Sequence, residues 1–441
     1  MMESILSDSK KKIFEKFLKP LEENDKLSCR RYKEANRDRP DGEFQRDYTR
    51  ILYSSSFRRL QGKMQLFAVQ SDQFIRNRLT HSLEVSQIAR SIATEIGYNT
   101  KDIYVVEACA LAHDIGNSPF GHAGERFLNH LSKDFGGFEG NAQTFRILTT
   151  VEQKRADFQG LNLTYRTLLG VLKYNNKFNN QLQENFSTQK FIYDKDYDLV
   201  EQIISDIEVE LRTLDVQIVD LADEIAYAAH DLEDGLRMGT FTTDEILHDF
   251  CKIVQNDDCQ KKLEEIFNDS KVRAGYRNEK IESAQFSKLY QKEIASKIIN
   301  ILINDIGIVK LSDEDKKKRG TKSEFEIGFT NYKLLASGLK ATTFKCITNN
   351  DEVYAYENSG KHMMEWLYKF YQKHSEYLPS EYRADNIILQ YDSNYQIEKE
   401  DQGLRKALQN RLIIDYISGM MDEYVKTAYH RLNRNGETSY E

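Results

Sequence analysis

The spacing of apolar and polar residues predicts a mostly helical protein. Residues 103–113 are almost continuously apolar, and residues 125–131 resume a helical pattern after a loop marked by Gly116 and Pro119. An earlier helix is expected to end near Gly97, because glycine is typical of helix C-termini. The apolar stripe of that helix recurs every four or five positions and consists of Leu79, Leu83, Ile88, Ile92 and Ile96.

The same periodicity predicts helices toward both ends of the chain. Residues 1–30 predict an N-terminal helix, and residues 361–377 and 404–432 predict helices near the C-terminus. Residues 200–238 are predicted to form one nearly uninterrupted helix, whose length leaves room for an internal break. The charged segment 312–323 is the expected mobile loop or domain boundary. Only 4 prolines and 22 glycines interrupt the 441 residues, so the predicted fold class is all-α.

The composition describes a well-solvated globular chain, with 40% hydrophobic and 30% charged residues, and excludes general disorder. Lys and Arg number 62 against 70 Asp and Glu, and the net charge of −8 argues against a generally basic, nucleic-acid-coating surface. Residues 30–59 nevertheless contain eight arginines. A local basic patch, with nucleic-acid binding as an added function, therefore stays open.

Two further features bear on cellular location. No apolar run approaches the roughly 18 residues of a membrane span, and the N-terminus lacks the apolar core of an export signal. We therefore expect a cytoplasmic protein with no membrane partner. The five cysteines are an odd number without a C-x-x-C pair, which predicts reduced thiols and neither a disulfide framework nor a thiolate zinc site.

Four of the nine histidines lie between residues 81 and 130. A single buried histidine is usually structural, but His113 directly precedes Asp114 where an apolar helix meets a Gly/Pro loop, so both side chains can meet one cation. His81 and Asp223 are the candidates for further ligands, because an unpaired carboxylate in an apolar helix is costly. Two nitrogen and two oxygen donors without thiolate favour Mn, Mg, Fe, Co or Ni over structural zinc.

Helical spacing relates other residues to this set. At about 100° per residue, Asp223, Tyr227 and Asp231 fall on one face of one helix, so they are expected to face one cavity. Arg78 lies one turn before His81.

A second pair is suited to proton transfer. His122 lies one turn before Glu125, close enough for the carboxylate to orient the imidazole. An oriented histidine beside a metal is what acid/base catalysis on a phosphate ester requires. Glu125 and Arg78, when each is considered alone, also have a purely structural interpretation. Each could form a surface salt bridge or interact with the helix dipole.

The ordered set H…HD…D resembles that of the HD-domain metal-dependent phosphohydrolases. More narrowly, five separated motifs between about residues 45 and 240 resemble the deoxyguanosine triphosphate triphosphohydrolase family, and beyond residue 245 the likeness thins to short pieces. One small departure is Ser118, where many relatives have a second proline before Pro119. The motifs are RLTHSLEV (78–85), AHDIGNSPFGHAGE (112–125), FEGNAQ (138–143), LNLTYRTL (161–168) and ADEIAYAAHDLED (222–234).

The resemblance implies roles for single residues. Gln65 and Asp231 would meet the sugar 3′-hydroxyl, and Tyr227 would pack under the deoxyribose and leave no room for a 2′-hydroxyl. Arg78 and Lys173 would lie at the triphosphate. The implied metal ligands are His81, His113, Asp114 and Asp223, and the implied catalytic pair is His122 and Glu125.

The resemblance also implies an architecture. We expect an all-α HD-domain helical bundle with an Arg-rich helical extension at residues 1–44, a phosphohydrolase core at residues 45–245 and a C-terminal helical region at residues 246–441. In the family that last region closes the base pocket and makes subunit contacts. A homo-oligomer is therefore expected, with a nucleotide or single-stranded DNA as a regulatory partner.

The expected function is hydrolysis of deoxynucleoside triphosphates, dGTP foremost, to deoxynucleoside and inorganic triphosphate. One divalent metal ion is expected per site, Mn or Mg first and Fe, Co or Ni as alternatives. One rival is an HD phosphohydrolase acting on a guanosine polyphosphate or a cyclic nucleotide, which Gln65, Tyr227 and Asp231 disfavour. Another is a nucleotide-sensing or single-strand-binding protein of the same fold, which His122 and Glu125 disfavour.

Overall fold

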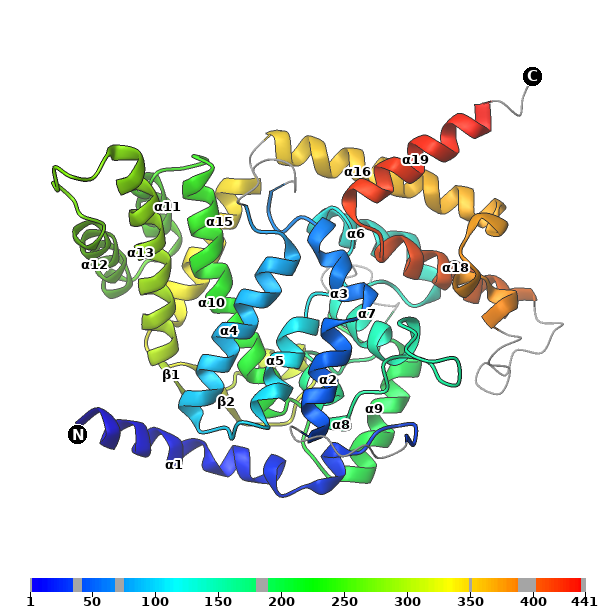
Figure 1. Cartoon of the computed structure of the whole chain (residues 1–441), viewed down its shortest axis with the longest axis horizontal. Helices are drawn as coiled ribbons and strands as arrows, with labels where there is room; N and C mark the ends of the chain where they lie inside the picture. Colours follow the sequence, from blue (N-terminus) through cyan, green and yellow to red (C-terminus); the bar gives the residue numbers. More distant parts are fainter. Residues whose placement is uncertain are drawn as a thin grey trace.

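The computed structural model places helix α10 (Leu214–Arg237) at the centre of a helical bundle (Figure 1). Nearly all α10 side chains are buried, so neighbouring helices surround it instead of covering one face. Helices α4 (Arg78–Ile96), α5 (Ile103–Ala112), α13 (Ser283–Asn304) and α15 (Lys333–Thr348) pack against it. The structure describes residues 2–34, 42–67, 75–179, 189–348, 351–387 and 402–437.

The other helices surround this centre. In the first half of the chain they are α1 (Met2–Glu22), α2 (Gly42–Leu52), α3 (Ser55–Arg59), α6 (Gly121–Ser132), α7 (Gly140–Arg146), α8 (Tyr165–Gly170) and α9 (Asp194–Ile207). In the second half they are α11 (Thr243–Ile253), α12 (Asp257–Arg273), α14 (Asp313–Arg319), α16 (Asp351–Lys373), α18 (Gln402–Ser418) and α19 (Asp422–Glu437). In the described part of the chain, strands β1 (Ile306–Lys310) and β2 (Phe325–Phe329) form a single antiparallel pair. The predicted all-α fold class is confirmed.

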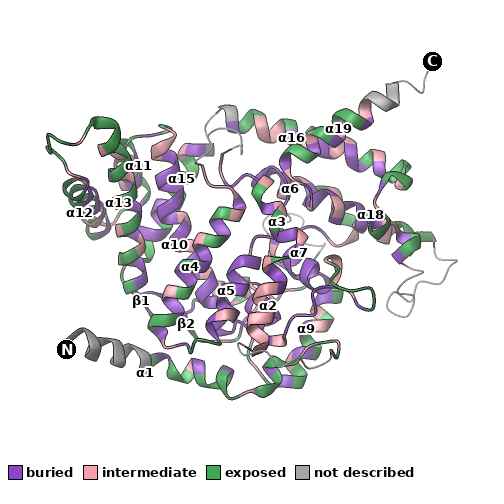
Figure 2. Ribbon diagram, viewed as in Figure 1, coloured by how far each residue is buried: buried purple, intermediate pink, exposed green. Residues whose placement is uncertain are grey.

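Two large apolar cores and one small cluster hold the described helices together. The larger core surrounds α4, α5 and α10, whose ribbons are mostly buried in Figure 2. The second core joins α6 to α16, α18 and α19, which lie beside it in Figure 1. Its members include Phe120, Leu128, Met364, Leu367, Ile413 and Ile414. The C-terminal helices are therefore packed directly onto the helix that carries His122 and Glu125.

Residues 200–238 form two helices, so the prediction of one nearly uninterrupted helix is wrong, and the internal break that its length allowed is present. Glu208 ends α9 with a φ of 54°, and Arg212 has a φ of 63°. Both values lie in the left-handed region that side chains disfavour. The buried Arg212 is held there by its bonds to Asp220 (2.7 Å) and Glu326 (2.9 Å), which stabilise the break.

Two other local predictions also need correction. Residues 312–323 were expected to be a mobile loop or a domain boundary, and the loop alternative is wrong because they contain helix α14. Ser312 caps this helix by accepting a hydrogen bond from the backbone of Asp315. Leu83, assigned to the buried stripe of α4, is 45% exposed. Polar residues of α4, His81 and Ser82 among them, face inward instead, because this helix lines a polar site.

The arginine-rich segment is engaged within the protein. Arg30 pairs with Asp47 at 2.5 Å and with Glu43 at 2.7 Å, and Arg50 pairs with Glu34 at 2.6 Å. These guanidinium groups stabilise the start of the bundle and do not form an open basic patch. Two of the eight arginines, Arg37 and Arg39, lie outside the described residues.

The described helices include none that is both long and apolar enough to cross a lipid bilayer. All five cysteines are free thiols, as the sequence predicted.

Candidate active site

The four predicted metal ligands converge from three helices. His81 comes from α4, His113 and Asp114 directly follow α5, and Asp223 comes from α10. Ligand atoms of His81, His113 and Asp114 all lie within 4.8 Å of one another. Asp223 Oδ1 is 3.1 Å from His81 Nε2 and 3.6 Å from His113 Nε2. The packing of α4, α5 and α10 thus brings the four predicted side chains together.

The donor set suits a divalent cation. His113 Nδ1 lies 2.7 Å from the carbonyl oxygen of Ala110, which fixes the ring and directs Nε2 into the cluster. That Nε2 atom is buried and has no hydrogen-bond partner among the described residues. In metal-ligating histidines, one ring nitrogen typically donates to a backbone carbonyl or carboxylate, and the other ring nitrogen binds the metal. The residues present therefore fit a metal ion.

The histidines and carboxylates of the cluster shift one another's pKa values. Burial lowers the pKa of His113, but Asp114 and Asp223 outweigh this effect and raise the pKa to about 9. Burial raises the pKa of Asp114, yet His113, Arg78 and His81 lower it to about 2. The pKa of Asp223 is likewise held well below its ordinary value, against burial, by both histidines and Lys173. Two ionised carboxylates therefore demand positive charge here, from protons or from a metal ion.

Asp114 is held by two further groups. Arg78 Nη1 donates to Asp114 Oδ2 at 2.5 Å, and Asn117 Nδ2 donates to Oδ1 at 2.5 Å. Arg78 is 2% exposed. Arg78 was predicted to bind the triphosphate. In the structure its guanidinium group donates to the carboxylate of Asp114.

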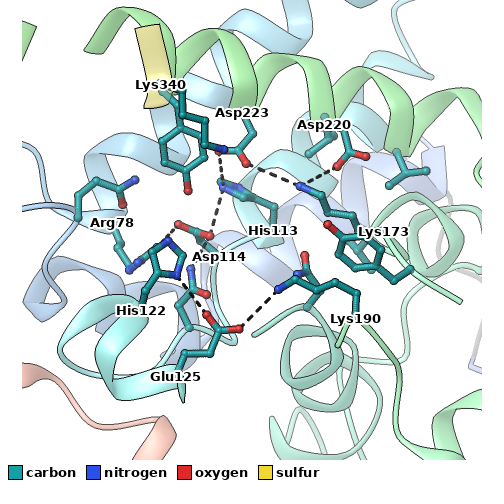
Figure 3. A pocket seen from close by; sticks show the side chains of 18 of the residues that line it. Arg78, His113, Asp114, His122, Glu125, Lys173, Lys190, Asp220, Asp223 and Lys340 are labelled. Atoms are coloured by element: carbon teal, nitrogen blue, oxygen red, sulfur yellow. Dashed lines mark hydrogen bonds and ion pairs between the residues drawn. The ribbon is translucent and has the colours of Figure 1, made fainter. Parts of the chain in front are cut away.

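The predicted catalytic pair lies on α6, at the mouth of the same cavity (Figure 3). His122 has 54% of its side chain exposed, and its Nδ1 lies 3.2 Å from Glu125 Oε2. Glu125 Oε1 accepts a hydrogen bond from the backbone of Gly140 at 3.1 Å. Burial raises the pKa of Glu125, but His122 and Lys190 lower it to about 2. Glu125 is therefore an ionised acceptor that orients the exposed imidazole.

Three of the predicted metal ligands, His113, Asp114 and Asp223, line one cavity of about 240 Å³ together with the predicted catalytic pair, and His81 contacts this set through Asp223. Lys173 lines it from the segment after α8, with its Nζ 3.1 Å from Asp220 and 3.9 Å from Asp223. Lys173 was predicted to lie at the triphosphate; in the structure its charge is shared with two carboxylates, one of which is the predicted metal ligand Asp223.

The three predicted sugar-binding residues also line this cavity. The Tyr227 ring lies 5.3 Å from the His81 ring, measured between centroids. Gln65 Oε1 is buried without a hydrogen-bond partner in the described part of the chain. Burial raises the pKa of Asp231 well above its ordinary value, with Asp234 adding to the effect. These groups offer a ring face, an amide acceptor and a buried carboxyl group to a ligand.

The sequence prediction missed several cavity residues. Lys190 approaches Glu125 at 3.8 Å and Glu139 at 2.7 Å, and Lys340 on α15 lies 4.1 Å from the Tyr227 ring centroid. No motif surrounds either lysine, so the sequence carries no local signal for them. Asn117 is different, because it stands inside the quoted motif AHDIGNSPFGHAGE and could have been chosen as a partner of Asp114.

Comparisons with known proteins agree with this geometry. A model described as HD domain matches residues 78–228, and a model described as phosphohydrolase-associated domain matches residues 331–431. The chain is 41% identical over 408 residues to deoxyguanosinetriphosphate triphosphohydrolase-like protein 2 of Vibrio cholerae, with 92% of each chain covered. It is 33% identical over 391 residues to the deoxyguanosinetriphosphate triphosphohydrolase-like protein of Leptospira interrogans, with 88% of this chain and 89% of the relative covered. A protein of that name from Bartonella quintana is 33% identical over 397 residues, with 88% of each chain covered.

Proposed function

The chain belongs to the HD-domain family of deoxyguanosinetriphosphate triphosphohydrolase-like proteins, and we propose from this premise that it hydrolyses deoxynucleoside triphosphates, dGTP foremost, to deoxynucleoside and inorganic triphosphate. One observation carries the proposal: the oriented His122–Glu125 pair shares a single cavity with one imidazole and two carboxylates, and a second imidazole, His81, lies 3.1 Å from one of those carboxylates. This combination supports phosphate ester hydrolysis, whereas a protein that only senses nucleotides needs no oriented acid/base pair.

The metal in this proposal is one divalent ion, Mn or Mg first and Fe, Co or Ni as alternatives, held by His81, His113, Asp114 and Asp223. Such an ion would supply Lewis acidity and positive charge at the α-phosphate. The mixed nitrogen and oxygen donors and the orphaned His113 Nε2 support this assignment.

His122 is proposed to move the proton or to attack in the hydrolytic step. With Nδ1 held by Glu125, the Nε2 atom is the one that can reach a substrate. It would act as an acid toward the leaving 5′-oxygen, or as a base or nucleophile at the α-phosphorus. Each role gains from the ionised Glu125, because its charge stabilises an imidazolium.

The cations of the cavity are proposed to meet the triphosphate. Arg78, Lys173, Lys190 and Lys340 all line the cavity, and Arg78 also donates to Asp114 (Figure 3). Lysine ammonium groups are common phosphate ligands. Their concentration explains how a chain of net charge −8 would attract a polyanionic substrate.

Gln65, Tyr227 and Asp231 are proposed to select a 2′-deoxy sugar. Gln65 and Asp231 would pair with the 3′-hydroxyl, and the Tyr227 ring would fill the space of a 2′-hydroxyl. The support is that all three line the cavity beside His81 and Asp223.

The test is product analysis. The purified protein is incubated separately with each dNTP, each NTP, a cyclic nucleotide and a guanosine polyphosphate in the presence of Mn or Mg, and the products are separated by anion-exchange chromatography. We expect deoxynucleoside and triphosphate in equal amounts, with dGTP turned over fastest. Diphosphate as product, or turnover only of a cyclic nucleotide or guanosine polyphosphate, would contradict the proposal. No turnover with measurable nucleotide binding would favour the sensing protein.

The assembly belongs to the same proposal. We expect a homo-oligomer in the cytoplasm whose activity responds to a nucleotide or single-stranded DNA. Measurement of the mass in solution, with and without dNTP, tests this expectation; a monomer under both conditions would contradict it.

A further inference from the structure

The turn between α18 and α19 lies against two segments that line the cavity. Asp422, the first residue of α19, is 1% exposed. Its Oδ2 accepts a hydrogen bond from the backbone of Met64 at 3.1 Å, and its Oδ1 accepts one from the backbone of Phe120 at 3.1 Å. Met64 directly precedes Gln65, and Phe120 lies two residues before His122. One buried carboxylate thus holds the backbone beside two proposed site residues.

A buried lysine adds a third connection. Lys63 is 1% exposed, and its Nζ donates to the carbonyl oxygen of Ser418 at 2.8 Å and to that of Asn117. Asn117 in turn donates to Asp114, one of the proposed metal ligands. Lys63 therefore links the last residue of α18 to the loop after α5. The two carbonyl oxygens supply hydrogen-bond acceptors to the buried amine, which compensates part of the cost of burying it.

The segment held by Asp422 is strained. Phe120 has a φ of 58°, in the left-handed region that bulky side chains disfavour. Its ring packs against Tyr356 at 5.2 Å between centroids, and against Gly360, where a Cβ atom would collide with it. The Tyr356 hydroxyl donates to Asp422 Oδ2 at 3.3 Å. The strain that sets the start of α6 is thus compensated by contacts from α16 and α19.

We propose that Asp422 is a positioning residue, which sets the places of Gln65 and His122 in the cavity by tying their backbones to the C-terminal helices. The inference rests on the proposed function and adds a role for a residue outside the cavity. Loss of the carboxylate leaves the N–H groups of Met64 and Phe120 buried without an acceptor, so both segments must shift to find one. A shift of about 1 Å at a catalytic group is enough to lower the rate roughly 100-fold.

The experiment compares Asp422→Ala and Asp422→Asn with a matched control, Asp415→Asn. Asp415 is also a buried carboxylate of the C-terminal region, but it bonds Gln143 and Arg146 of α7 and touches neither cavity segment. All variants are assayed at a temperature where circular dichroism shows them folded. We expect Asp422→Ala to lower kcat for dGTP by about 10- to 100-fold with unchanged metal content.

Asp422→Asn and Asp415→Asn distinguish a positioning role of Asp422 from a general loss of stability. Asp422→Asn keeps one carbonyl oxygen as acceptor, so it should recover part of kcat. Asp415→Asn should lower the melting temperature as Asp422→Ala does but keep kcat within about twofold of the wild type, because the backbones of Met64 and Phe120 keep the Asp422 carboxylate as their acceptor. A kcat for Asp422→Ala within twofold of the wild type would overturn the proposal.

A second measurement does not depend on turnover. Hydrogen exchange followed by mass spectrometry reports the amides of Met64 and Phe120 in peptides that cover residues 60–67 and 117–122. Both peptides should exchange faster in Asp422→Ala and not in Asp415→Asn. Unchanged exchange in both would also overturn the proposal. If the wild type hydrolyses no dNTP, the proposed function fails, and the exchange result still decides whether Asp422 holds these segments.

Discussion

The Nη1 atom of Arg78 lies 2.5 Å from Oδ2 of Asp114, and both side chains are buried. The second oxygen of Asp114 accepts a hydrogen bond from Asn117. The two bonds hold the carboxylate in one orientation, and the positive charge of Arg78 favours its ionised form. Groups of this kind behind a metal ligand orient it and tune its affinity. Arg78 is thereby placed to act through Asp114, in addition to any contact with a phosphate.

This relationship predicts that Arg78→Met weakens metal binding. The expected loss is about 10- to 100-fold in affinity for Mn, the usual effect of removing an outer partner of a ligand. Isothermal titration calorimetry of the metal-free protein measures it. Arg90→Met is the control, because Arg90 lies on the same helix, is exposed and pairs with Glu107. Unchanged Mn affinity with only a raised KM for dGTP would instead assign Arg78 to the triphosphate.

His122→Ala separates chemistry from binding. The variant should keep its metal and bind dGTP, and should lose about 10²- to 10⁴-fold in kcat, the worth of a positioned acid or base. Steady-state kinetics and metal analysis check this, with His130→Ala as the control because His130 is an exposed histidine of the same helix. A raised KM with unchanged kcat would make His122 a substrate-positioning residue.

The metal-free protein should become less stable as pH rises. Burial lowers the pKa of His113, but Asp114 and Asp223 raise it to about 9, above the ordinary value of 6.5. Between these values the folded state holds a proton that the unfolded state has released, so the free energy of unfolding falls as pH increases. The contribution is complete below pH 6.5 and lost above pH 9.

Melting curves across this window, in EDTA and in Mn, check the prediction. Saturating Mn should remove the decline, because the metal takes the place of the proton. His113→Gln in EDTA should have a flatter profile than the wild type. A wild-type melting temperature that rises between pH 6.5 and 9 in EDTA would contradict the assignment.

The sequence predicted the centre of the site because its residues stand in dense motifs on long helices. His113 and Asp114 are adjacent, and Asp223, Tyr227 and Asp231 repeat at helical spacing, so local pattern places the members of each group on one side of one element. The packing of α5 against α10 then brings the two groups to one cavity. The same periodicity misassigned Leu83, because apolar character alone does not reveal that α4 turns polar residues toward a site.

Other contacts in and around the site form only when segments distant in the sequence pack together. Lys340 reaches the Tyr227 ring only because α15 packs on α10, and Asp422 reaches Phe120 across 302 positions of sequence. Neither contact leaves a pattern in the chain. The break before α10 is similar, since it is stabilised by the bond of Arg212 to Glu326 on β2, a partner 114 residues away.

Tyr227 is predicted to discriminate dGTP from GTP. It stands one turn after Asp223 on α10, with its ring 5.3 Å from that of His81 and with Lys340 over it. A ring held in this way cannot move aside for a 2′-hydroxyl, so a ribonucleotide must either clash or bury an unpaired polar group. Each cost is of order 1–3 kcal/mol, and together they disfavour GTP by roughly 10²-fold or more.

Tyr227→Ala should therefore lower the ratio of kcat/KM for dGTP over GTP, and should also lower kcat/KM for dGTP, because the aromatic contact with the sugar is lost together with the steric barrier. Tyr227→Phe keeps the ring and should keep the ratio, which separates shape from the hydroxyl group. The measurement is kcat/KM for both nucleotides at one Mn concentration. Equal values for dGTP and GTP in the wild type would reject Tyr227 as the selecting residue and would favour an HD phosphohydrolase that acts on ribonucleotides.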